Sequence, residues 1–174
     1  NAKTLIEILD QGCSPMGSRL MKRWLALPLK HTKPILDRQL IVKYFIENET
    51  ITSEISDSIK HIGDLERLIS KVALLRINPR EVVTLKRSLN AIEPIIKLTT
   101  NKKCTQLNSL ANILNPCNVI KNKIESELNE EAPILLAKGN TIKNGVSEEL
   151  DDLRLLLNNS KQYLKELQER ESKN

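Results

Sequence analysis

Leucine recurs with a fixed period near the C-terminal end of the chain. Steps of three and four residues alternate through Leu150, Leu153, Leu157, Ser160, Leu164 and Leu167. Such a heptad pattern places one seam, with a single polar member, along a helix. A helix from Glu148 to Ser172 would be roughly 38 Å long at 1.5 Å per residue, which is more than a small core needs. We expect its first half to lie along the other helices and leave open whether its second half projects beyond them.

A second helix is predicted between Ser14 and Pro28. Ser14 is a good N-cap, Pro15 suits the first helical position, and Pro28 stops the helix. Four apolar residues recur at helical spacing on one face. They are Met16, Leu20, Trp24 and Leu27. We interpret this face as a core anchor against which later helices pack.

A basic arc flanks that face and consists of Arg19, Lys22 and Arg23. It could meet phosphate, acidic side chains of a neighbouring domain, or only water. Charge alternates along the whole chain, with net values of +5, −3, +7 and −4 over residues 1–45, 46–75, 76–123 and 124–174. This alternation suits helices with complementary faces. We expect the arc to serve domain contacts before DNA contacts.

The next helices follow from proline, glycine and capping residues. Pro34 opens a helix with apolar residues on more than one side, which predicts a central position, and residues 47–50 form a polar loop. Thr52 or Ser53 caps a third helix, which Gly63 interrupts.

Asp64 is expected to cap the helix that follows Gly63. A catalytic carboxylate here lacks any companion base or ligand, so we interpret Asp64 and Glu66 as structural. Their expected ion-pair partner is Arg67, Arg76 or Arg80.

Asn78, Pro79 and Glu81 form a capping box at the start of a helix that should run to about Glu93, closed by Pro94. Lys86 and Arg87 are expected to face outward. Two shorter helices are predicted over residues 105–114 and 116–128. Residues 129–147 form a connector, in which residues 134–136 and 141–142 either make short strands or pack across helices. Ser147 should cap the last helix.

Composition excludes several classes of protein. Only 2% of the residues are aromatic and only five are glycine, which argues against an all-β domain. The three cysteines are too widely spaced for a disulfide framework or a zinc site, and the two histidines have no second ligand at metal spacing. No nucleophile, base and orienting acid occur together, so an enzyme is not expected. No apolar run is long enough for a membrane span, which favours a cytoplasmic protein without membrane partners.

Three segments resemble the core domain of the MutS family of DNA mismatch repair proteins. Residues 13–29 are similar to that family's S/T-P-M-G signature and the basic helix ending in W-L-x-x-P-L. Residues 64–74 and 144–171 follow in the family's order, the last resembling the start of its long lever helix. The resemblance covers nearly the whole chain. It implies an all-α, elongated bundle of about six to eight helices over residues 3–146, with the lever helix beginning at residue 147.

The resemblance also implies a division of labour. The parent protein would bind mismatched duplex DNA as a dimer, and a separate C-terminal domain would bind and hydrolyse ATP with magnesium. We expect the phosphate loop, the mismatch-reading Phe-x-Glu motif and the clamp to lie outside this chain, which would hold no cofactor itself. The chain is interpreted as an excised piece, with Asn1 and Ala2 as an expression scar. Its role would be mechanical, with Trp24, Asp64, Glu66, Arg67, Leu157 and Leu164 as structural residues.

A rival hypothesis is a basic helical module that binds duplex nucleic acid directly and without sequence preference. The residues available for it are Arg19, Lys22, Arg23, Arg80, Lys86, Arg87, Lys102 and Lys103. Such a module should show a steep salt dependence of DNA binding. Because aromatic residues are not interleaved with these cations, the basic excess supports the rival only weakly.

Overall fold

The structure, a computed structural model, describes residues 3–100 and 103–171. It is built of helices, and the described part contains no strand beyond one isolated bridge. The all-α prediction is therefore confirmed. The helices are α1 (Leu5–Leu9), α2 (Pro15–Ala26), α3 (Thr32–Glu47), α4 (Glu49–Lys60), α5 (Leu65–Ala73), α6 (Pro79–Asn90), α7 (Ile92–Thr99), α8 (Thr105–Ala111), α9 (Asn118–Glu127) and α10 (Glu148–Glu171), with a 3-10 turn, Leu136–Lys138.

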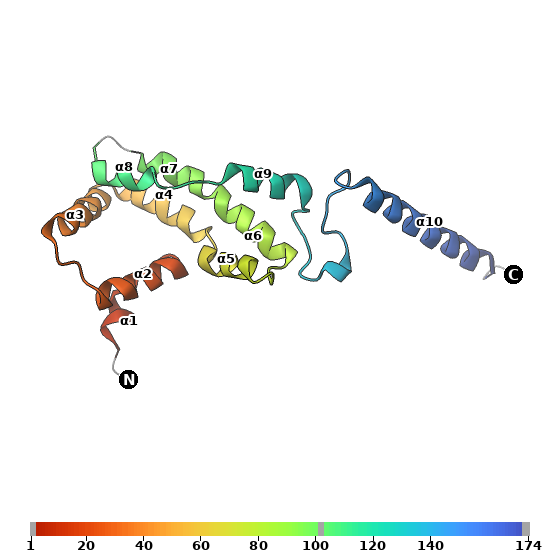
Figure 1. Ribbon diagram of the computed structural model, residues 1–174, viewed down its shortest axis with the longest axis horizontal. Coiled ribbons are helices and arrows are strands. Elements are labelled where there is room, and N and C mark those ends of the chain that lie inside the picture. Colours follow the sequence, from red (N-terminus) through yellow and green to blue (C-terminus); the bar gives the residue numbers. More distant parts are fainter. Residues whose placement is uncertain (1–2, 101–102, 172–174) are drawn as a thin grey trace.

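The molecule is elongated (Figure 1). Helices α1 to α3 and α8 lie toward one end, α4 to α7 and α9 form the middle, and α10 leaves the other end alone. In the middle, α6 packs against α5, α7 and α9, while α7 also contacts α4 and α8. The buried apolar side chains follow this arrangement and include Val83, Leu89, Ile92, Ile95, Leu107 and Ala111. Helices α6 and α7 are thus the centre of the core.

Most helix starts confirm the capping predictions. The Ser14 hydroxyl accepts a hydrogen bond from the Gly17 amide at 3.1 Å. Asp64 caps α5 through the Arg67 amide, and Asn78 and Glu81 form the expected capping box. The Ser147 hydroxyl accepts from the Leu150 amide at 3.3 Å. Local side-chain chemistry therefore fixed these boundaries correctly.

The predicted position of α3 is wrong. This helix begins at Thr32 rather than Pro34 and lies at the edge, where only Tyr44 is buried. The polar loop predicted over residues 47–50 shrinks to Asn48, which separates α3 from α4. Asn48 donates a side-chain hydrogen bond to the Tyr44 carbonyl at 2.8 Å, closing the end of α3. Apolar residues on several sides of α3 thus mark exposed surface in this chain rather than a central position.

The core anchor predicted on α2 is also wrong. No residue of α2 is buried, and the Trp24 side chain is 39% exposed. Helix α2 contacts α1, the acidic start of α5 and, through Trp24, Arg38 of α3. The helical spacing on α2 was read correctly, but sequence alone could not say whether a partner covers that face.

Helices α1 and α7 were not predicted. Helix α1 begins with a capping box formed by Thr4 and Glu7, which the sequence carries openly. Pro94 lies in the first turn of α7 and does not close α6, which ends at Asn90. A proline in the first turn loses no intrahelical bond, so it starts a helix as readily as it ends one.

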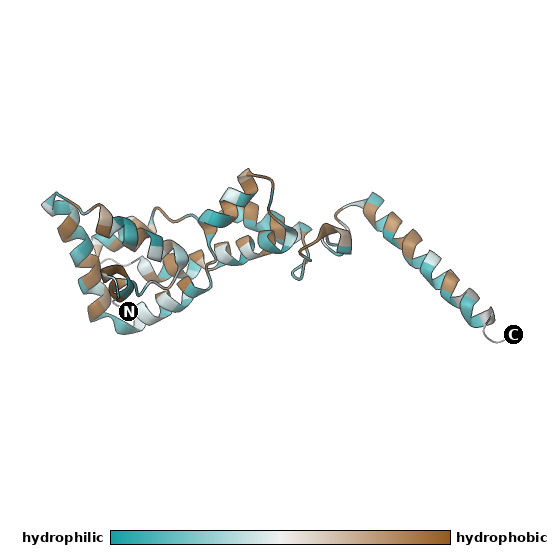
Figure 2. Ribbon diagram, turned by 90° about the horizontal axis from the view of Figure 1, so that it is seen from below, coloured by the Kyte–Doolittle hydropathy of each residue, from teal (hydrophilic) through white to brown (hydrophobic). Residues whose placement is uncertain are grey.

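Helix α10 departs most from expectation. Its first half was predicted to lie along the other helices, yet it extends away from them over its whole length (Figure 1). Hydrophobic residues recur along it (Figure 2), and Leu153, Leu157 and Leu164 are exposed. The connector forms no paired strands: Leu128 and Ile142 form the isolated bridge, and residues 134–136 are exposed.

Ser88 joins the α4–α5 junction to α6. Its hydroxyl accepts a hydrogen bond from the Gly63 amide and donates one to the Thr84 carbonyl, both at 2.9 Å. Ser88 is 0% exposed, and a Cβ at Gly63 would lie 3.2 Å from the Ser88 hydroxyl. The junction therefore needs both the glycine and the serine.

We predict that Ser88→Ala lowers the free energy of unfolding by about 1–3 kcal/mol, because the Gly63 amide loses its partner away from water. Urea titration followed by circular dichroism measures the change. Ser109→Ala is the matched control, since the exposed Ser109 hydroxyl bonds only to the carbonyl four residues earlier. Equal losses in the two variants would contradict the proposed bond between the junction and α6.

Candidate interdomain coupling site

The base of α10 is held by a compact set of polar contacts. Arg154 donates hydrogen bonds from Nη1 to Asn144 Oδ1 and to Asp151 Oδ1, both at 2.9 Å, and from Nη2 to the Ile142 carbonyl at 2.8 Å. Asp151 Oδ2 accepts from the Gly145 amide at 2.6 Å. Gly145 has φ of +83°, a conformation that glycine adopts without strain. We call residues 142–145 with Asp151 and Arg154 the α10 base.

The connector is fastened a second time, to α6. Lys86 is only 5% exposed and forms an ion pair with Glu130. Arg87 Nη2 donates to the Glu130 carbonyl at 3.1 Å, and Arg80 Nε donates to the Ala132 carbonyl at 3.4 Å. The hydrogen bond from Lys86 is the main cause that lowers the pKa of Glu130 below its ordinary value. The basic side of α6 therefore binds the start of the connector.

The outward orientation predicted for Lys86 is wrong, because its ammonium group turns inward to reach Glu130. Arg87 keeps an exposed side chain but still contacts the same glutamate, at 3.6 Å from Nη2 to Oε2. A cation with a partner on a distant segment cannot be recognised from helical periodicity alone. The signal that the sequence offered was the acidic pair Glu130 and Glu131 in a connector that holds no other acidic residue.

Arg19 ties α2 to the start of α5. Its Nη1 and Nη2 donate to the two carboxylate oxygens of Asp64 at 2.9 and 2.7 Å, and its Nε donates to Glu66 Oε2 at 2.7 Å. Hydrogen bonding from the Arg19 side chain is the main cause that lowers the pKa of Asp64 below its ordinary value. Arg67 lies farther off, with 3.6 Å between its Nε and Asp64 Oδ2.

The ion pair expected at Asp64 and Glu66 forms, and its main partner is Arg19 on α2. Arg76 and Arg80, the other candidates, form no ion pair with either carboxylate in the described part of the chain, and Arg80 faces Ala132 instead. Of the basic arc, Arg19 meets acidic side chains, but within this chain rather than on a neighbouring domain. Lys22 and Arg23 are exposed.

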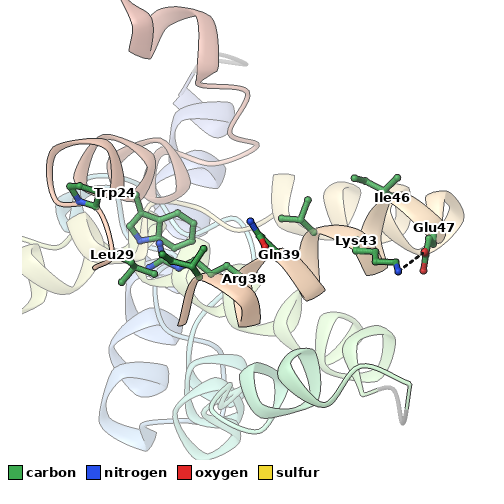
Figure 3. A pocket seen from close by; sticks show the side chains of 10 residues that line it. Trp24, Leu29, Arg38, Gln39, Lys43, Ile46 and Glu47 are labelled. Carbon is green, nitrogen blue, oxygen red and sulfur yellow. Dashed lines mark ion pairs between the residues drawn. The ribbon is translucent and has the colours of Figure 1, made fainter. Parts of the chain in front are cut away.

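Trp24 contacts α3 through its ring. The Arg38 guanidinium carbon lies 3.6 Å from the centroid of the Trp24 ring, a cation–π contact (Figure 3). On one side of this pair is an apolar groove of about 610 Å³, whose far end carries the Lys43–Glu47 ion pair at 3.8 Å. On the other side, a groove of about 620 Å³ runs toward α8. The structural role predicted for Trp24 stays a prediction, which the contact with Arg38 supports.

The remaining predicted residues are distributed as follows. Leu157 and Leu164 lie on the projecting part of α10 and are 56% and 63% exposed. Lys103 is exposed, and Lys102 lies outside the described residues. Residues 1–2, taken as an expression scar, lie outside them too. The structure brings together Arg19, Asp64 and Glu66, and separately Lys86, Arg87 and Glu130.

The glycine pair at the start of α2 does not fit a phosphate loop. Gly12 and Gly17 have the spacing of a phosphate loop, but Ser18 and Arg19 follow where lysine and serine or threonine are needed. Asp10 Oδ1 accepts hydrogen bonds from the Gly12 amide at 3.1 Å and the Ser18 hydroxyl at 2.9 Å. A carboxylate thus occupies the place that an anionic phosphate would take.

The Phe-x-Glu pattern, which we expected to lie outside this chain, occurs in its sequence. Phe45, Ile46 and Glu47 spell the Phe-x-Glu pattern. Phe45 is half-buried beside Tyr44, with ring centroids 5.9 Å apart, so it is not free to stack on a base. The pattern here belongs to the packing of α3.

Within residues 3–100 and 103–171, no three histidine, cysteine or acidic side chains gather in a way that could hold a metal ion. Over the same residues, none of the helices is both long and apolar enough to cross a membrane.

The fold and the two fastened ends of the connector are those of a helical domain that carries a long, free-standing helix. The family model described as MutS domain III matches residues 1–173. The chain therefore belongs to the MutS domain III family.

Curated relatives agree. The chain is 45% identical over 172 residues to "DNA mismatch repair protein MutS" of Flavobacterium johnsoniae, covering 99% of this chain and 20% of that protein. It is 47% identical over 169 residues to the protein of the same name from Bacteroides fragilis, covering 97% and 20%. Over 167 residues it is 47% identical to the one from Cytophaga hutchinsonii, covering 96% and 20%. The chain thus spans about one fifth of the length of the relatives that it matches.

We predict that Glu130→Ala destabilises the domain by about 1–2 kcal/mol, because Lys86 stays buried without its carboxylate. The loss should be smaller than the 3–5 kcal/mol of a fully buried pair, since Glu130 is half exposed. Denaturant titration measures it. Glu131→Ala, at the exposed neighbouring position, is the control and should change little. A loss as large in the control would mean that connector charge in general, not the Lys86 contact, is responsible.

The Arg19–Asp64 pair predicts a specific dependence of stability on pH. A carboxylate whose pKa is lowered by folding adds stability above its unfolded pKa, about 3.9 for aspartate, and this stability is lost as the pH falls through the folded pKa. Asp64→Asn keeps a good N-cap but removes the charge. The variant should be less stable at pH 7 and should lose less stability between pH 5 and pH 2.

Denaturant titrations across that pH range test this. Arg19→Gln should reproduce the flatter profile, and the double variant should be no flatter than either single one. Additive effects of the two substitutions would show that Arg19 is not the group that lowers the pKa of Asp64.

Proposed function

We propose that this chain is the core and lever part of a DNA mismatch repair protein and works mechanically. In the whole protein it would connect mismatch-binding and clamp parts to a C-terminal ATPase. The observation that carries the proposal is α10: a 24-residue helix, about 36 Å long, fastened at its base and free along its length. A stiff helix held at one end transmits rotation to the other.

The relatives are named as DNA mismatch repair proteins, and this supports the further proposals for the whole protein. They are binding of mismatched duplex DNA, dimer formation, ATP hydrolysis with magnesium in a separate domain, and a cytoplasmic location. The fragment's own share would be transmission, without ATPase activity or mismatch specificity.

Direct binding of duplex DNA by the basic residues is less well supported. Arg19, Arg80, Lys86 and Arg87 contact acidic groups or carbonyls of this chain. These contacts compete with phosphate; three of the four cations lie on α6 and one lies on α2. At least four of the eight cations on which the rival hypothesis relied are therefore engaged internally.

Coupling through α10 can be tested in the full-length protein with Leu157→Asp and Leu164→Asp together. Because both side chains are exposed here, the substitutions should leave the fold of this chain intact. They should break the contact of α10 with whatever it moves and slow ATP-driven release from mismatched DNA. Stopped-flow fluorescence of labelled DNA measures the release.

The control is Leu155→Asp with Gln162→Asp, which has the same seven-residue spacing but lies about 200° around the helix. Normal melting of both double variants, with slow release only in the first, is the expected result. Release at the normal rate in a folded Leu157→Asp, Leu164→Asp protein would refute the mechanical role.

A further inference from the structure

The end of α9 and the end of the connector run side by side. Leu128 and Ile142 form an isolated antiparallel bridge. The Lys143 amide donates to the Glu127 carbonyl at 2.8 Å, and the Asn129 amide donates to the Thr141 carbonyl at 3.0 Å. Lys143 Nζ also donates to the Glu125 carbonyl at 2.6 Å. The chain therefore returns to α9 before it enters α10.

The Asn129 carboxamide stabilises the contact between the end of α9 and the end of the connector. Its Nδ2 lies 3.0 Å from both the carbonyl oxygen and the Oδ1 of Asn140, and 3.2 Å from the Ile142 carbonyl oxygen, so one amide group serves three acceptors. Asn140 has φ of +55°, a conformation in which asparagine is enriched. Asn129 thus fixes the turn that leads into the α10 base.

The Ile142 carbonyl is shared between the two sides. It accepts from Asn129 Nδ2 on the α9 side and from Arg154 Nη2, at 2.8 Å, on the α10 side. Two hydrogen bonds through one oxygen therefore join the end of α9 to the first turns of α10. This route is much shorter than the connector itself.

The tip of the connector lies off that route. Ile134, Leu135 and Leu136 are exposed, and Gly139 turns the chain back with φ of +69°. The side-chain hydrogen bonds of the α10 base, within the residues that the structure describes, do not involve residues 134–138. The backbone runs through residues 134–138, but the hydrogen bonds between the end of α9 and the α10 base bypass them.

We propose that Asn129 is the positioning residue that sets the direction of α10, acting through the Ile142 carbonyl, and that residues 134–138 take no part in this. The inference rests on the proposed lever function only for its consequence in the whole protein. The orientation itself can be measured without any activity.

The test measures the distance between spin labels at Lys123 on α9 and Lys161 on α10, both exposed, in the 174-residue chain. Labels on keto side chains avoid cysteine chemistry. Asn129→Ala and the isosteric Asn129→Asp, which lacks the donor, should lose the narrow distance distribution while the melting temperature of the bundle stays close to normal. Asn122→Ala, at an exposed position on α9, is the matched control.

Replacement of residues 134–138 by glycine and serine at equal length should leave the distribution narrow. In a background with Cys13, Cys104 and Cys117 changed to alanine, Leu128→Cys with Ile142→Cys should rescue Asn129→Ala when oxidised. Residues that face each other in a non-hydrogen-bonded antiparallel pair lie about 4.5 Å apart at Cα, within the range of a disulfide.

A narrow distribution in Asn129→Ala, a broad one in the tip replacement, or failure of the oxidised pair to rescue would each overturn the inference. Release assays in the full-length protein separate it from the proposed function. If Asn129→Ala broadens the distribution but DNA release stays coupled to ATP, Asn129 positions α10 and the lever role is overturned instead.

Discussion

The attachment of α10 depends on polar contacts rather than on apolar burial. Arg154 joins the connector to the first two turns of the helix, and Glu130 joins the connector to α6. Hydrogen bonds and ion pairs have directions, whereas apolar contacts tolerate sliding. A joint built from them can hold one orientation while burying little surface, which suits a helix that leaves the bundle.

The same contacts explain the excess of positive charge on α6. Sequence alone suggested a basic surface, yet Arg80, Lys86 and Arg87 turn toward backbone carbonyls and one glutamate in the connector. Arg19 acts similarly at the other end, between α2 and α5. The alternation of charge along the chain therefore reflects internal pairing between distant segments, as complementary helices predict.

Helix boundaries could be predicted where local chemistry decides them, as at Ser14, Asp64, Asn78 and Ser147. Burial could not. The apolar residues on α2 and α3 do recur at helical spacing, but most of their side chains are exposed. Periodicity identifies an apolar face and does not tell which other segment of the chain covers it. The polar contacts around the connector were not predicted for a related reason: Asn129, Glu130 and Arg154 each have partners ten or more residues away, which no helical repeat reveals.

The free length of α10 has a geometric consequence. For a rigid arm of about 36 Å, a rotation of about 10° at the base displaces the far end by about 6 Å, roughly one helical turn. A change of that size at the base needs only small shifts in the contacts around Ile142 and Arg154. The domain would thus amplify displacement, because sub-ångström rearrangements beside α9 become much larger movements at the far end of α10.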